Sequence, residues 1–194
     1  MPTDILRIIL PVYFLLYFLF LFVFKAIAIK KQIGKSPFIF SRMSWYFILM
    51  IVALTFYLII FTFFPDYYPL LLPISILTHS IIQFIGMGLL VLSFIWIIIA
   101  QNQMRKSWRV GIDEQTKTEL ITNGVFSFSR NPIYLGMIAS LIGLFLTTPN
   151  LFTLVLLILS CILIRVQIIF EENYLTKMHG QSFLDYKKDV RRLI

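Results

Sequence analysis

The chain has 194 residues, of which 59% are hydrophobic and only 13% carry a charged side chain. Charged residues make up about a quarter of a typical soluble domain, so the composition excludes a soluble globular protein and predicts an all-α integral membrane protein. The formal net charge of +8 does not indicate nucleic-acid binding, because the basic residues lie beside apolar runs, where they set topology and meet anionic lipid headgroups.

Five predominantly apolar runs predict about five transmembrane helices, because about 20 apolar residues cross a ~30 Å hydrocarbon layer. The last two runs are separated only by Pro149 and Asn150, a pair typical of a tight turn. We therefore expect a C-terminal helical hairpin over residues 132–170. The five runs lie at residues 5–29, 44–64, 74–100, 132–148 and 151–170.

These runs divide the chain into two regions. Residues 1–100 hold three N-terminal helices, and residues 101–194 hold a long polar loop, the hairpin and a charged tail. We expect no metal site, because Cys161 is the only cysteine and neither His79 nor His179 has a second ligand at helical spacing.

The positive charges of the loops predict the orientation, because short basic loops stay on the cytoplasmic side. With five spans, the three basic regions all fall on one face, so we expect the N-terminus outside and the C-terminus in the cytoplasm. The Lys and Arg residues are Lys30, Lys31, Lys35 and Arg42 after the first run, Arg105, Lys106, Arg109, Lys117 and Arg130 in the long loop, and Arg165, Lys177, Lys187, Lys188, Arg191 and Arg192 toward the C-terminus.

The tail has the pattern of an amphipathic helix. Ser182 and Asp185 are spaced as in a capping box that follows Gly180. This predicts either an interfacial helix on the inner leaflet or a solvated helix that closes over the cytoplasmic loop. The apolar residues at helical spacing are Phe183, Tyr186, Val190 and Leu193.

The fourth run opens with a segment suited to binding an anion. Pro132 costs nothing in the first turn of a helix, where its missing amide has no partner, and the remaining free amides can hold a carboxylate or phosphate. Gly136 lets another backbone or a ligand approach. The alternative is an ordinary capped transmembrane helix with Arg130 and Tyr134 at headgroup level.

Adjacent carboxylates at the end of the fifth run are costly near hydrocarbon. Glu171 and Glu172 can accept hydrogen bonds from hydroxyls, stabilise a cation or act as a base. The alternative is a structural ion pair with Arg130 or Arg165.

In their order and spacing, these blocks resemble the isoprenylcysteine carboxyl methyltransferase family of phospholipid methyltransferase-like membrane enzymes, and the short chain is similar to compact prokaryotic members. The family motif Arg-His-Pro-x-Tyr-x-Gly has asparagine here at position 131. Gln167 stands where relatives commonly have arginine, and Arg165 lies two residues earlier. The matching blocks are residues 120–126, 130–136, 171–175 and 180–186.

The resemblance implies S-adenosylmethionine as the methyl donor, held on the cytoplasmic side by a catalytic region spanning residues 101–194. The implied catalytic candidates are Gln167, Glu172 and Arg165. The implied cofactor-binding residues are Thr118, Glu119, Leu120, Ile121, Phe126, Asn131, Pro132, Tyr134 and Glu171.

The activity implied is methylation of the C-terminal carboxylate of a prenylated cysteine, or of a similar lipid-tailed acid that enters from the inner leaflet. A phospholipid N-methyltransferase is the nearest alternative in chemistry, and it requires a base to remove a proton from the ammonium. The sequence also leaves open an NADPH-dependent sterol-type reductase and a non-catalytic membrane scaffold.

Overall fold

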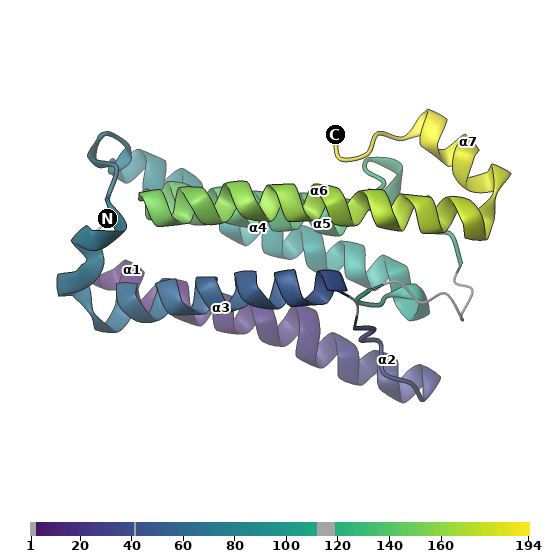
Figure 1. The fold of residues 1–194 in the computed structure, drawn as a ribbon, viewed down its shortest axis with the longest axis horizontal. Helices are drawn as coiled ribbons and strands as arrows, with labels where there is room; N and C mark the ends of the chain where they lie inside the picture. The colour runs from purple at the N-terminus through teal and green to yellow at the C-terminus, as the bar shows by residue number, and fades with distance from the viewer. Residues whose placement is uncertain (1–2, 41, 112–118) are drawn as a thin grey trace.

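The computed structural model describes residues 3–40, 42–111 and 119–194. Seven α-helices and several short helical turns make up this part of the chain, and it contains no β-strand (Figure 1). The α-helices are α1 (Thr3–Phe18), α2 (Lys25–Ile33), α3 (Arg42–Phe63), α4 (Ser80–Met104), α5 (Pro132–Thr147), α6 (Leu151–His179) and α7 (Gln181–Asp189).

Four of the described helical stretches are long and apolar enough to cross a membrane, at Asp4–Ile33, Met43–Phe63, Ser80–Ser107 and Leu151–His179. This confirms the all-helical membrane fold. The predicted fourth span is α5, which has 16 residues and is therefore only about 24 Å long. Its crossing of the bilayer stays a prediction, as does the division at residue 100.

The first predicted span is one continuous helical path whose middle turn is widened. A π-helical segment, η1 (Leu19–Phe24), joins α1 to α2. Widened turns free backbone groups from regular pairing, and here the Leu21 carbonyl accepts a hydrogen bond from Gln101 Nε2 at 3.0 Å.

The helices differ most from the predicted apolar runs at two ends. α6 continues nine residues beyond position 170, to His179, because no helix breaker occurs before Gly180; the apolar run ends earlier than the helix. α4 begins at Ser80 instead of position 74, because the backbone amide of Ile74 pairs with the Pro149 carbonyl of the hairpin turn at 2.9 Å.

The predicted hairpin of α5 and α6 is present, and its turn is held by Asn150. The Asn150 side chain accepts a hydrogen bond from the Thr153 amide at 2.9 Å, which caps α6. It also donates to the Tyr57 hydroxyl of α3 at 3.2 Å. The turn is therefore tied to the neighbouring helix as well as to its own.

Glycines bring α4 and α5 into close contact. A Cβ atom on Gly86 would lie 2.7 Å from the Gly143 carbonyl oxygen, and one on Gly136 would overlap the side chain of Ile97. Backbones approach this closely in membranes where small residues line the interface. The sequence left open whether a backbone or a ligand uses the space at Gly136, and the structure shows that helix α4 does.

The tail forms the predicted helix only as far as Asp189, in α7, so Val190 and Leu193 lie beyond it. The predicted capping box is not formed. Gly180 is the N-cap, with φ at +57° and no side-chain cap, because Asp185 instead accepts hydrogen bonds from Gln181 and Lys188 at 2.9 and 2.8 Å. Phe183 is 1% exposed, so the apolar face packs on protein. This favours the alternative in which the helix closes over the loop.

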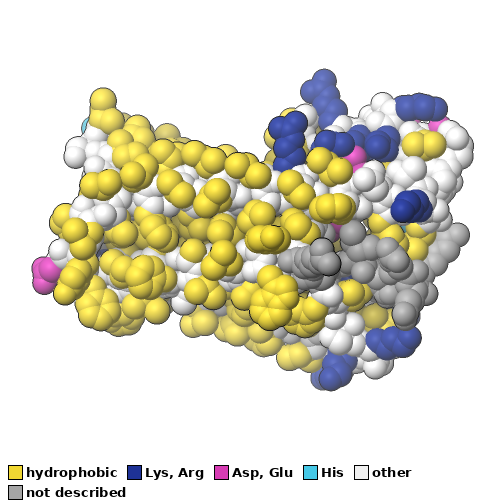
Figure 2. Space-filling view, in the orientation of Figure 1, with side chains coloured by type: hydrophobic (Ala, Val, Ile, Leu, Met, Phe, Trp, Pro, Cys, Tyr) yellow, Lys and Arg dark blue, Asp and Glu magenta, His cyan; other side chains and the backbone are white. Residues whose placement is uncertain are grey.

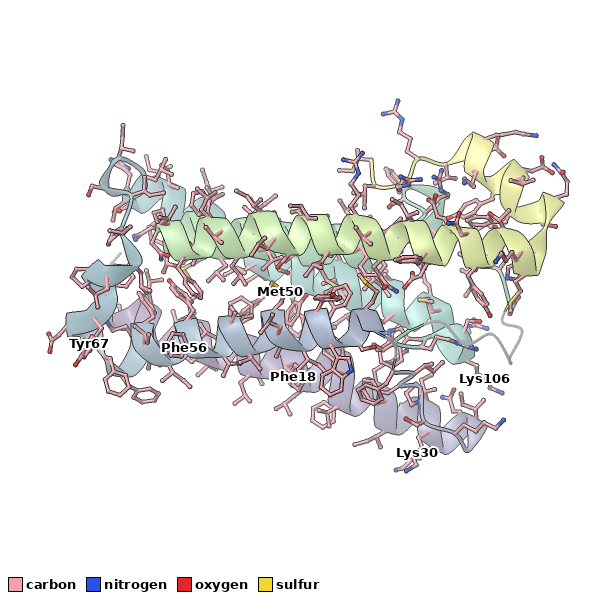
Figure 3. The ribbon with its side chains drawn as sticks, viewed as in Figure 1. Phe18, Lys30, Met50, Phe56, Tyr67 and Lys106 are labelled. Carbon is pink, nitrogen blue, oxygen red and sulfur yellow. The ribbon has the colours of Figure 1, made fainter. Side chains whose placement is uncertain are left out.

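The surface separates into an apolar belt and a basic end. Hydrophobic side chains cover most of the face in Figure 2, and Lys and Arg gather at the end that carries α2 and α7. Lys30 and Lys106 lie at this end and Tyr67 at the opposite end (Figure 3). The loops that the sequence predicts on one side of the membrane therefore do lie together.

Candidate functional site

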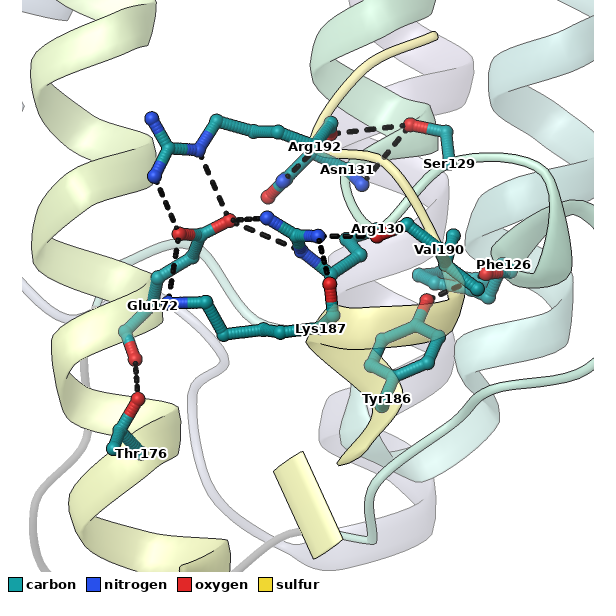
Figure 4. Close-up of polar contacts among 10 residues, drawn as sticks. All are labelled: Phe126, Ser129, Arg130, Asn131, Glu172, Thr176, Tyr186, Lys187, Val190 and Arg192. Carbon is teal, nitrogen blue, oxygen red and sulfur yellow. Dashed lines mark hydrogen bonds and ion pairs between the residues drawn. The ribbon is translucent and has the colours of Figure 1, made fainter. Parts of the chain in front are cut away.

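The two adjacent glutamates of α6 have different surroundings. Glu172 is 3% exposed and lies among three cations (Figure 4). Arg130 Nη2 is 2.9 Å from its Oε1 atom, Arg192 Nη2 is 2.8 Å from its Oε2 atom, and Lys187 Nζ is 3.6 Å from Oε2. A buried carboxylate paired in this way is a structural anchor, since removing one partner leaves an uncompensated charge.

This anchor holds the end of the chain on the Arg130–Asn131 segment. Residues 190–192, which we call the C-terminal strap, pass beside Asn131, whose side-chain amide donates to the Arg192 carbonyl at 2.9 Å. The Arg130 amide donates to the Arg191 carbonyl at 3.0 Å, and its guanidinium also contacts the Val190 carbonyl. The hydrogen bond to Glu172 raises the pKa of Arg192 above its usual value, in keeping with a direct ion pair between the strap and α6.

Glu171 belongs to a second group of polar side chains. Its Oε1 atom accepts hydrogen bonds from the Tyr134 hydroxyl at 2.5 Å and from Gln167 Nε2 at 2.8 Å. Gln167 is one turn before Glu171 on α6, whereas Tyr134 is in the first turn of α5. The hairpin therefore brings together residues from two of the blocks that the sequence singled out.

This second group lines one end of a large cavity of about 1180 Å³. At the polar end, the walls include Glu119, Asn131 and Tyr134 besides Gln167 and Glu171. From there the cavity extends between α1, η1, α3, α5 and α6, where most of the lining is apolar. One continuous space thus joins a polar region to an apolar one deep among the membrane helices.

Aromatic side chains close the polar end. Phe126, Phe183 and Tyr186 are buried and line the cavity, and the Tyr186 hydroxyl donates to the Phe126 carbonyl at 2.5 Å. Burial raises the pKa of Tyr186 to about 12, so it remains a donor at neutral pH. α7 is in this way connected to the loop that precedes α5.

The structure brings most of the expected cofactor-binding residues to this cavity. Thr118 lies outside the described residues. The others all line the cavity: Glu119, Leu120, Ile121, Phe126, Asn131, Pro132, Tyr134 and Glu171.

The three catalytic candidates are placed differently. Gln167 lines the cavity, 6% exposed, and contacts Glu171. Glu172 and Arg165 are not among the lining residues; Glu172 faces the cation cluster, and Arg165 is exposed on another face of α6. Of the three, only Gln167 can touch a molecule in the cavity.

Two residues of the site were not singled out from the sequence. Trp108 is 3% exposed and lines the cavity, and Arg192 anchors the C-terminal strap. Arg192 belongs to a basic tail whose charges all pointed equally to lipid headgroups, so no local signal distinguished it. Within the described residues, no group of three or more His, Cys, Asp or Glu residues could hold a metal ion.

Two comparisons with known proteins give a match. A family model described as phospholipid methyltransferase matches residues 81–182, a little more than half of the chain. A solved structure described as the eukaryotic intramembrane Ras methyltransferase, isoprenylcysteine carboxyl methyltransferase, matches at a TM-score of 0.68 and 22% sequence identity, covering all of this chain and 68% of its own. No curated protein sequence matches this chain. The phospholipid methyltransferase-like group expected from the motifs is confirmed, together with the membrane fold.

Proposed function

Because the chain belongs to the phospholipid methyltransferase family, we propose that it transfers a methyl group from S-adenosylmethionine to the polar end of a lipid acceptor. The observation that supports this most directly is the single cavity with a polar and an apolar end. A water-soluble donor and a lipid acceptor can react only where both reach the same space. The basic end of the bundle, where the polar residues lie, is proposed to face the cytoplasm.

The polar end has the chemistry to hold the donor. The Oε1 atom of Glu171 accepts the hydrogen bonds from Tyr134 and Gln167. The other carboxylate oxygen can therefore accept hydrogen bonds from hydroxyl groups of a nucleoside. Amides in the first turn of α5 lack helical partners and suit a carboxylate, and Phe126 offers an apolar wall. When bound, S-adenosylmethionine supplies a methyl group on a sulfonium, which is open to direct attack.

For the acceptor, we propose the carboxylate of a prenylated cysteine or a similar lipid-tailed acid. A carboxylate is ionised at neutral pH, so its methylation needs alignment and exclusion of water but no base. The apolar part of the cavity offers space for the tail. Gln167 lines the cavity, and in this proposal it orients the polar end of the acceptor by donating a hydrogen bond. Arg165 is left out of this proposal because it does not line the cavity.

Phospholipid N-methylation is the second candidate, favoured by the description of the matching family. An ammonium must lose a proton before it attacks the methyl group. Among the described lining residues of α5 and α6, Glu171 is the carboxylate available to take that proton.

Cofactor binding is the first test. Purified protein should bind radiolabelled S-adenosylmethionine, and S-adenosylhomocysteine should displace it whereas NADPH should not. Binding of NADPH alone would favour the sterol-type reductase and overturn the proposal.

The acceptor is tested by the pH dependence of methyl transfer to a farnesylated cysteine analogue and to phosphatidylethanolamine. Transfer to the acid should be nearly flat from about pH 6.5 to 8.5, because the carboxylate is ionised throughout. Activity only on the phospholipid, rising steeply with pH, would contradict the carboxylate proposal and support the second candidate.

A further inference from the structure

The apolar part of the cavity contains hydroxyl groups that the proposed reaction does not use. Tyr17 of α1, Ser140 of α5 and Ser160 of α6 all line it. The Ser140 hydroxyl lies 2.8 Å from that of Ser93 on α4, and the ring of Tyr17 lies 5.6 Å from that of Phe94, the residue after Ser93. Polar groups facing hydrocarbon carry a cost unless they form hydrogen bonds.

Ser160 is exceptional among the hydroxyls of these helices. Serine and threonine within helices commonly bond the carbonyl four residues earlier, and this chain repeatedly shows that contact. Ser160 is only 7% exposed and makes no hydrogen bond to any residue that the structure describes, although it lines the cavity. The hydroxyls that do bond this carbonyl are Thr55, Ser140, Thr147, Thr148 and Thr176.

The three hydroxyls lie at similar depth. Ser140 and Ser160 are on antiparallel helices, and each is about ten residues, or about 15 Å, from the turn at Pro149 and Asn150. Tyr17 is at the level of Ser140, because its ring lies 5.6 Å from that of Phe94, the residue after Ser93, whose hydroxyl contacts Ser140. The π-helical segment η1 begins two residues later; such segments often mark functional positions in helices.

From these positions we propose that Tyr17, Ser140 and Ser160 form a binding site for an oxygen atom within the lipid tail of the acceptor, with Ser160 as the donor. The site lies well away from the reacting end, since Glu171 is eleven residues further along α6, about 16 Å. An all-hydrocarbon tail leaves the Ser160 hydroxyl without a partner. A tail with an ester, ketone or hydroxyl oxygen at this depth satisfies it, so among the lipid-tailed acids proposed above the preferred acceptor bears such an oxygen, and a prenylated cysteine, whose tail is all hydrocarbon, binds more weakly.

This inference rests on the proposed function only in taking the occupant to be the acceptor, and it is tested by binding. The probes are N-acetyl-S-hexadecyl-cysteine and its analogue with a ketone midway along the tail, each competing with a fluorescent lipid on the purified protein. The wild type should bind the ketone about tenfold more tightly, the equivalent of roughly 1.4 kcal/mol, within the range of a single hydrogen bond.

Ser160→Ala should remove this preference without weakening the binding of the hydrocarbon tail. Cys161→Ala is the matched control, because Cys161 is the next residue on α6 and does not line the cavity. It should keep the preference. Equal binding of the two tails by the wild type, or an unchanged preference in Ser160→Ala, would overturn the inference. If the wild-type protein prefers the ketone-bearing tail but transfers no methyl group, the result supports this site and refutes the proposed function.

Discussion

At the scale of single residues, Glu171 and Glu172 show how one helical position changes a side chain's role. Adjacent residues on an α-helix point about 100° apart, so Glu171 faces the cavity and Glu172 faces the cations Arg130, Lys187 and Arg192. One carboxylate is therefore available to a ligand, and the other is occupied by the fold.

Glu171→Gln should weaken S-adenosylmethionine binding by about 1 to 3 kcal/mol, because a buried polar group loses an ionic partner, and it should leave the melting temperature nearly unchanged. Tyr134→Phe should act in the same direction, since it removes the hydroxyl that donates to Glu171. Isothermal titration in detergent measures both, with Arg165→Ala as a control on the exposed face of α6. Wild-type affinity in both variants would mean that the donor binds elsewhere.

Glu172→Ala should lower the stability of the protein and leave donor binding intact, the reverse of what we expect for Glu171→Gln. Loss of this carboxylate leaves the guanidinium of Arg130, whose side chain is 9% exposed, without its ionic partner, and such losses cost roughly 3 to 5 kcal/mol. The melting temperature should fall clearly, while any folded protein should still bind the donor. A wild-type melting temperature would show that the cation cluster contributes nothing to stability.

At the scale of elements, the contact between α4 and α5 depends on missing side chains. Gly86 lies against the backbone of α5 near Gly143 and Thr147, whereas a Cβ atom on Gly88, two residues later on α4, would have open space around it, with no neighbour within 4 Å. The same helix thus carries one glycine required by packing and one that is free to change.

Gly86→Ala should destabilise the protein by about 1 to 3 kcal/mol, the usual cost of overpacking a close contact, because the helices must move apart. Gly88→Ala should be neutral or slightly stabilising, since alanine favours a helix more than glycine does. Thermal unfolding in detergent compares the two. Equal melting temperatures would show that α4 and α5 are not packed as described.

The C-terminal strap makes the second contact between elements that can be tested. A chain that ends at Asp189 loses the carbonyls that Arg130 and Asn131 contact, so we expect at least a tenfold loss of methyl transfer. Deleting Ile194 alone, which is 81% exposed, should have little effect. Full activity of the shortened chain, measured with radiolabelled donor in membranes, would refute a role for the strap.

At the scale of the whole molecule, the ends of the bundle differ in charge and in chemistry. The basic residues and α7 share one end (Figures 1 and 2). The polar part of the cavity, lined by Tyr134 at the start of α5 and by Gln167 and Glu171 of α6, lies toward the same end. Such an asymmetry suits an enzyme that takes one substrate from the cytoplasm and the other from the bilayer.

Tags placed after Ile194 and beside Lys35 should be accessible only from the cytoplasm, and a tag beside Asp66 only from outside. Cysteine-accessibility labelling of intact and permeabilised cells measures this. Labelling of Lys35 and Asp66 from the same side would mean that α3 does not cross the membrane.

Features of the site that depend on neighbouring residues could be predicted from the sequence, whereas features that depend on residues far apart in the chain could not. The Arg130–Gly136 and Glu171–Glu172 segments could be singled out because their residue types are costly or unusual beside apolar runs. Trp108 and Arg192 could not, because their importance comes from partners far away in the chain: Arg192 lies 20 residues from Glu172 and 62 from Arg130.

A helical membrane protein with a C-terminal hairpin could be predicted from the amino-acid sequence, because apolar run length and turn residues act locally. Which glutamate faces the cavity could be learned only from the fold, because it depends on how α6 is rotated against α3 and α5. The packing of α7 on the protein is likewise a property of the fold. Apolar side chains such as Phe183 and Tyr186 can be buried equally well against lipid or against protein, and in the structure they are buried in the wall of the cavity.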